Sequence, residues 1–83
     1  MKKGDDLIEL IDLLAQIMED EGVPRNIKEK IKKAIEALED RSKDIKIKIN
    51  RALQELDEVS DDPSLPSYIR PQLWNIASSL ESL

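Results

Sequence analysis

Apolar residues recur every three or four positions along the chain, in four segments separated by short turn-forming stretches. Residues with this spacing share one face of an α-helix, so each segment predicts an amphipathic helix. The predicted helices run over about residues 5–21, 24–38, 45–59 and 69–80. A chain of 83 residues suits one small domain, and we predict a single all-α domain over residues 1–83.

The ends of the first helix carry residues that favour its start and its stop. Asp5 and Asp6 suit a helix N-terminus as capping residue and as partners of the helix dipole. Gly22 suits the C′ position that follows a helix, where glycine is common. We therefore expect this helix to extend to about Glu21.

The stretch 46–49 alternates between Lys and Ile, which is the period of a β-strand. The helical register that starts at Ile45 continues through Val59, and the chain has no second strand to pair with this one. A helix is therefore favoured. Ile47 lies off its apolar stripe, and we predict that this side chain is exposed.

Pro71 would fall about one turn inside a helix that began at Pro66. A proline there removes a backbone hydrogen bond and crowds the preceding turn. We expect a short distorted turn first, and a regular helix from about Arg70.

The sequence overlays itself without a gap when it is shifted by 42 residues. Asp20 then falls on Asp62, Pro24 falls on Pro66, and the apolar positions of both flanking helices coincide. The shift predicts two copies of one antiparallel αα-hairpin, at residues 5–40 and 43–82. A two-helix repeat of this length lies in the HEAT/armadillo range, so we predict a HEAT-like four-helix unit.

Each predicted hairpin contains an acidic residue in its turn and a basic residue at the start of its second helix. The pairs are Asp20 with Lys28 and Asp62 with Arg70. We expect the aspartate to accept amide hydrogen bonds at the start of the next helix, and the basic residue to neutralise it.

Three motifs resemble a known family: Val23-Pro24-Arg25-Asn26-Ile27, then the stretch 56–63 (Leu-Asp-Glu-Val-Ser-Asp-Asp-Pro), then Leu73-Trp74-Asn75. They are similar to the turns and last helix of the small archaeal Uncharacterised Protein Family 0147. Val59 and Asp61 depart mildly from that pattern. The resemblance implies a small all-helical archaeal cytosolic protein, and it brings no assigned activity and no catalytic residue.

The composition excludes several kinds of chemistry. The chain has no Cys and no His, which excludes disulfides, thiolate catalysis, structural zinc and imidazole acid–base catalysis. No nucleophile–base set or phosphate-binding loop is visible, so we predict no enzyme, no cofactor and no catalytic residue. Carboxylates cluster in two stretches, 19–21 and 57–62, but without metal-ligand spacing, and we expect no metal site.

Charge and hydropathy bear on partners. The net charge of −5 disfavours unspecific binding to nucleic acid or to anionic lipid. The basic residues are interleaved with acidic ones and lack aromatic neighbours, so we do not expect nucleic acid as a partner. No apolar run has the length of a membrane span, and the missing cysteines are compatible with the cytoplasm, where we expect the protein.

The first helix predicts the main candidate interaction surface. Its apolar residues spread over roughly 220° of its circumference, about twice the arc of the second and third helices. Two interpretations stay open. Either the helix is central and contacts the other three, or Leu10, Leu13 and Ile17 face a second subunit or another protein. A second subunit would make a homodimer through this helix.

The remaining candidates are Ile47, Arg70 and Trp74. Trp74 lies off the apolar stripe of the last helix, one turn after Arg70. We favour edge packing with Arg70 stacked on the ring, with a binding hot spot as the alternative. The sequence leaves the biological process unknown and favours a small non-enzymatic protein-interaction or structural module. The alternative is a nucleic-acid- or ribosome-associated accessory protein.

Overall fold

The structure is a computed structural model, and it describes residues 3–83. Over that range the chain forms helices and turns, without a strand. The elements are α1 (Lys3–Met18), α2 (Arg25–Glu39), α3 (Ile45–Asp61) and α4 (Arg70–Glu81). The predicted all-α class and the four helices are confirmed. The stretch 46–49 lies within α3, so helical periodicity prevailed over the short strand-like alternation.

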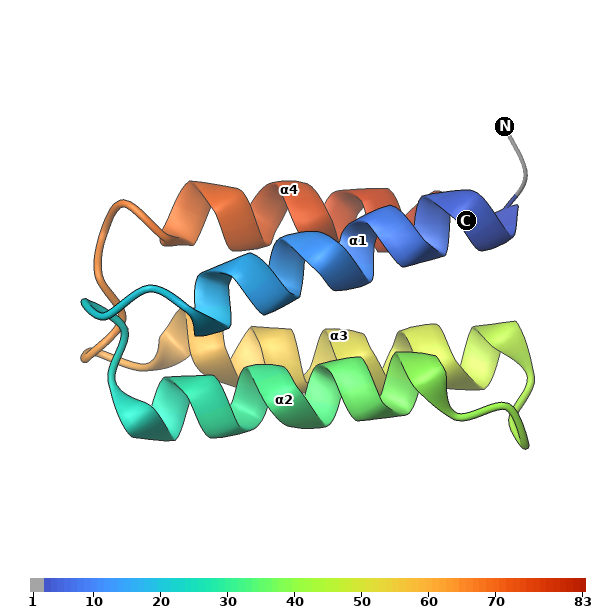
Figure 1. The fold of residues 1–83 in the computed structure, drawn as a ribbon, viewed down its shortest axis with the longest axis horizontal. Coiled ribbons are helices and arrows are strands. Elements are labelled where there is room, and N and C mark those ends of the chain that lie inside the picture. Colours follow the sequence, from blue (N-terminus) through green and yellow to red (C-terminus); the bar gives the residue numbers. More distant parts are fainter. Residues whose placement is uncertain (1–2) are drawn as a thin grey trace.

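The helices run alternately up and down and close into a four-helix bundle (Figure 1). Each helix packs against its neighbours in sequence, and α4 returns to pack against α1. The diagonal partners stay apart at the backbone: no Cα atom of the described part of α1 lies within 8 Å of a Cα atom of α3. Helix α1 is therefore one of four helices around a shared core, and its backbone packs along α2 and α4 and not along all three others.

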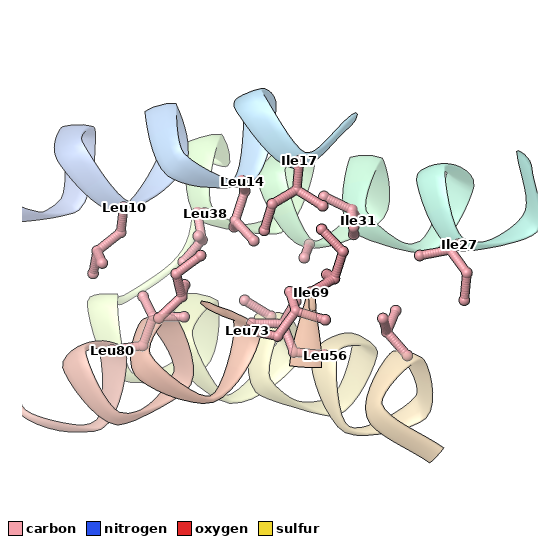
Figure 2. Packing of buried hydrophobic residues seen from close by; sticks show 14 of the residues in the cluster. Leu10, Leu14, Ile17, Ile27, Ile31, Leu38, Leu56, Ile69, Leu73 and Leu80 are labelled. Atoms are coloured by element: carbon pink, nitrogen blue, oxygen red, sulfur yellow. The ribbon is translucent and has the colours of Figure 1, made fainter. Parts of the chain in front are cut away.

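One apolar core fills the space between the four helices. Its labelled side chains point toward one another from all four helices in Figure 2. Fully buried members include Leu14, Ile31, Leu56 and Leu73, one from each helix. The described residues include no buried polar or charged side chain, so the interior is held by apolar packing alone.

The first helix has different ends from those predicted. It begins at Lys3 and ends at Met18, three residues before the expected boundary. Gly22 is therefore in the following turn rather than at C′, and no described glycine has a positive φ. The expected capping role of the Asp5 side chain falls outside the described residues.

Pro24 and Pro71 lie at helix starts, where a proline removes no hydrogen bond of the helix backbone. Pro24 is the N-cap of α2, one position before the expected N1 site. Pro71 is in the first turn of α4, where backbone N–H groups have no partner within the helix. The predicted short turn followed by a regular helix from Arg70 is confirmed.

Candidate functional site

The three candidates on α1 have different environments. Leu10 and Ile17 are 7% and 3% exposed and belong to the core, so they offer little surface to a partner, unlike the exposed positions that the sequence predicts. Leu13 is 44% exposed. The core of the closed bundle lies in the direction of Leu10, Leu14 and Ile17, which share one face of the helix. Leu13 is at the edge of that face and remains accessible.

The other candidates are exposed. Ile47 is 47% exposed, as predicted. Trp74 is 75% exposed, so edge packing, the favoured interpretation, is wrong. The Arg70 guanidinium donates a hydrogen bond of 2.6 Å to the main-chain carbonyl of Ser60, at the end of α3. Arg70 and Trp74 line a surface between α3 and α4, whereas Leu13 lines one between α1 and α4, so the structure does not bring the candidates into one site.

A groove lies between α1 and α4. It has a volume of about 380 Å³. Leu10, Ile17, Ile69 and Ile76 are apolar residues that line it and belong to the core. Leu13 also lines the groove and is its exposed apolar residue.

The rim of this groove is almost uncharged. Among the described residues that line it, the polar ones are Gln16 on α1 and Gln72, Asn75 and Ser79 on α4, and Asp20 is the one ionisable residue. In a chain with 37% charged residues this is unusual. The sequence analysis missed these rim residues. The sequence does contain a signal for this rim: the uncharged residues at 72, 75 and 79 are spaced to share one face of a helix.

At one end of the bundle, the first and last turns are joined by two hydrogen bonds between side chains. The Tyr68 hydroxyl donates to the carboxylate of Asp20, 3.0 Å from each of its oxygens. The Asn26 side-chain amide donates to Asp62 Oδ2 at 2.9 Å. These contacts link segments far apart in the sequence and help to close the bundle.

Two of the turn carboxylates, Asp40 and Asp62, accept hydrogen bonds that favour their charged form. The hydroxyl and then the amide of Ser64 donate to Asp62 and lower the pKa of that carboxyl below its ordinary value. Ser42 lowers the pKa of Asp40 in the same way. Donation by Tyr68 to the Asp20 carboxylate raises the pKa of the tyrosine, because the bond requires the neutral phenol.

The predicted partners of the turn aspartates are different in the structure. Asp20 and Asp62 accept from amides two residues ahead, in Gly22 and Ser64, instead of from amides of the next helix. Arg70 is bonded to a main-chain carbonyl and not to Asp62. An aspartate side chain readily reaches the backbone amide two residues ahead in its own turn. The amides of the next helix are farther along the chain than that.

Among the described residues there is no group of three acidic side chains placed to hold a metal ion. The groove between α2 and α3 contains both signs of charge, because its lining includes two basic and three acidic residues: Lys33, Arg51, Glu36, Asp40 and Glu55. This surface therefore has no uniform positive potential that would attract phosphate groups. No described helix has the length and hydropathy needed to cross a bilayer.

Fold and groove together define a class: small closed four-helix bundles with one apolar core. The sequence profile of the Uncharacterised protein family UPF0147 matches residues 1–83. The chain belongs to this family, as the resemblance of its turn motifs indicates.

Relatives in archaea are similar over most of their length. The UPF0147 protein of Pyrococcus furiosus is 35% identical over 71 residues, which cover 86% of this chain and 76% of the relative. That of Thermococcus kodakarensis is 37% identical, covering 86% of each chain. That of Metallosphaera sedula is 39% identical over 73 residues, covering 88% of this chain and 82% of the relative.

A solved structure has the same fold. The crystal structure of the unknown function protein MMP1188 matches this chain with a TM-score of 0.95 at 35% identity. The match covers 99% of this chain and 93% of that one.

Proposed function

We propose that this protein is a non-enzymatic interaction module that pairs with a second copy of itself through the groove between α1 and α4. The observation that carries the proposal is the position of Leu13. It is an exposed apolar side chain beside a groove whose deeper lining is apolar. A surface on which an apolar side chain lies beside an apolar groove can be self-complementary. A two-fold axis then places the Leu13 side chain of each copy in the groove of the other copy.

Charge favours the same face. Two copies with a net charge of −5 repel each other over most of their surfaces. The groove rim is formed by neutral amide and hydroxyl side chains, with Asp20 as its one ionisable residue. Contact here therefore buries few like charges, and the neutral side chains can exchange hydrogen bonds across the interface.

The test is the oligomeric state of a glutamate variant. We expect the unmutated protein to dimerise at micromolar concentrations, and Leu13→Glu to give a folded monomer because it puts a charge into the apolar contact. Sedimentation equilibrium measures the mass, and circular dichroism checks the fold. Ile47→Glu is the matched control, since Ile47 and Leu13 have nearly equal exposure, 47% and 44%, on different helices.

Three results would overturn the homodimer proposal. The first is an unmutated protein that is monomeric at 100 μM or more. The second is equal loss of association in both variants, which would indicate unspecific apolar contact. The third is a dimer in Leu13→Glu. A nucleic-acid-associated role is the competing proposal, and saturable binding of an RNA oligonucleotide, weakening steeply with salt, would support it.

We also propose that the chain is a duplicated hairpin that closes on itself instead of stacking as an open HEAT solenoid. The two hydrogen bonds between the turns support this, because a shift of 42 residues converts Asn26 into Tyr68 and Asp20 into Asp62. Each bond is thus the counterpart of the other. An approximate two-fold axis along the bundle would account for both.

A further inference from the structure

A shallow hollow lies between α3 and α4, on the flank of α4 that faces away from the groove. Its volume is about 290 Å³. Trp74, at 75%, is the most exposed of the large apolar side chains of the described chain, and it lines this hollow. The other lining residues come from the C-terminal half of α3 and from α4: Leu56, Asp57, Ser60, Asp61, Arg70 and Ala77.

Small side chains open the hollow. Ser60 and Ala77 line it, and the residues 42 positions earlier are Met18 and Ile35. Met18 and Ile35 are large, and both are partly buried and pack against the core. In the proposed duplication, the second hairpin thus has small side chains where the first has large ones.

The charges around the hollow favour a cation. Asp57 and Asp61 are exposed carboxylates in the last two turns of α3, the negative end of the helix dipole. That last turn contains no basic residue. Arg70 supplies the one cation, and its guanidinium is already bonded to the Ser60 carbonyl at 2.6 Å. The hollow therefore combines an aromatic surface with a net negative charge.

We propose that this hollow binds a lysine or arginine side chain from a basic segment of a partner protein. The aliphatic stem packs on Leu56, Ala77 and the Trp74 ring, and the charged end reaches Asp57 and Asp61. A cation beside an indole is attracted by the ring quadrupole as well as by the carboxylates. A nucleic acid would bring its phosphates toward these same two carboxylates, which disfavours it.

This inference rests on the proposed role as an interaction module, but it concerns a different surface. Ile69, Gln72, Asn75, Ile76 and Ser79 line the α1/α4 groove, whereas Arg70, Trp74 and Ala77 line the hollow. Pairing through the groove leaves the hollow open. Failure of the dimer proposal would appear in sedimentation, and failure of this one would appear in peptide binding.

Trp74 makes the test direct, because it is the one tryptophan of the chain. The full-length protein is titrated with a hexalysine peptide while tryptophan fluorescence is recorded. We expect a saturable change in emission. Ala77→Ile introduces the side chain that the first hairpin has at the corresponding position, Ile35, and fills the hollow. This variant should abolish the saturable change in emission without altering the charge. Ser60→Met is a second filling variant, and circular dichroism confirms that each variant folds.

A matched pair of double variants separates local charge from net charge. Asp57→Asn with Asp61→Asn should weaken peptide binding by at least about threefold, since exposed ion pairs contribute modestly. Glu9→Gln with Asp12→Asn removes the same charge from exposed positions on α1 and should leave binding within twofold.

Four results would overturn the proposal. They are a linear response without saturation, unchanged affinity in a folded filling variant, equal weakening by both double variants, and saturable binding of an oligouridylate in place of the peptide.

Discussion

At the scale of single residues, Gly22 shows how a tertiary contact selects an amino acid. An added Cβ at Gly22 would lie 2.5 Å from the Tyr68 hydroxyl oxygen, too close for that hydroxyl to keep its place. The same hydroxyl donates to Asp20, whose Oδ1 also accepts from the Gly22 amide. Glycine is thus favoured by the approach of the Tyr68 hydroxyl, and not by a left-handed backbone, because no described glycine has a positive φ.

We expect Gly22→Ala to destabilise the protein by displacing the Tyr68 hydroxyl from Asp20. In a Tyr68→Phe background the obstructing oxygen is gone. Alanine should then cost less than in the unmutated protein, because only Asp20 Oδ1, 3.2 Å from the added Cβ, still has to move, and because alanine restricts the unfolded chain by about 0.4–1 kcal/mol more than glycine does. Urea unfolding of the four proteins measures both effects. Equal destabilisation by Gly22→Ala in both backgrounds would contradict the role of the Tyr68 hydroxyl.

At the scale of elements, the three connections between helices share one local design. In each, an aspartate Oδ1 accepts from the amide two residues ahead: Asp20 from Gly22, Asp40 from Ser42, and Asp62 from Ser64. In such a turn, the aspartate side chain stabilises the change in chain direction through a hydrogen bond to the turn's own backbone. The ends of the helices are therefore determined locally, which explains why the sequence located the turns.

Acid should weaken the turns through Asp40 and Asp62. Both pKa values are lowered in the folded protein from an ordinary value of 3.8, chiefly by the serine hydroxyl two residues ahead. A lowered pKa means that the contribution to stability is complete above the unfolded pKa and is lost as the pH falls through the folded one. We expect the unfolding free energy to fall as the pH drops below about 4.

The measurement is carboxyl titration by NMR together with unfolding at several pH values. Ser42→Ala and Ser64→Ala should move the pKa of the neighbouring aspartate back toward 3.8 and flatten the acid limb. Titration of Asp62 at or above 3.8 in the unmutated protein would show that its hydrogen bonds do not favour the charged form.

At the scale of the whole molecule, one continuous core joins the four helices. Leu14 and Leu56 are 0% and 2% exposed, and they are 42 residues apart in the sequence. If the chain is a duplicated hairpin closed around an approximate two-fold axis, these leucines occupy equivalent places in the core. Their surroundings should then respond alike to the loss of a side chain.

We expect Leu14→Ala and Leu56→Ala each to destabilise the protein by about 2–5 kcal/mol and by similar amounts, through lost burial and a residual cavity. Chemical denaturation gives both values. Leu13→Ala is the control at an exposed site and should change stability by about 0.5 kcal/mol or less in the monomer. A large difference between the two core variants would count against the duplication.

The sequence by itself determined the all-α class, the four helices, the place of the turns and the exposure of Ile47. These depend on local spacing and on side chains that bond within their own turn. Leu10, Leu13 and Ile17 show the limit of such reasoning. Their spacing established an unusually wide apolar face, but not which part of it would be covered.

Only the tertiary structure decided the rest. Return of α4 to α1 buried Leu10 and Ile17 and left Leu13 at the edge of a groove. The same closure brought Tyr68 to Asp20, and packing of α3 against α4 left Trp74 beside a hollow. These features arise between residues that are distant in the sequence. An amphipathic pattern predicts that one face of a helix is buried, but it does not predict which neighbouring helix covers that face.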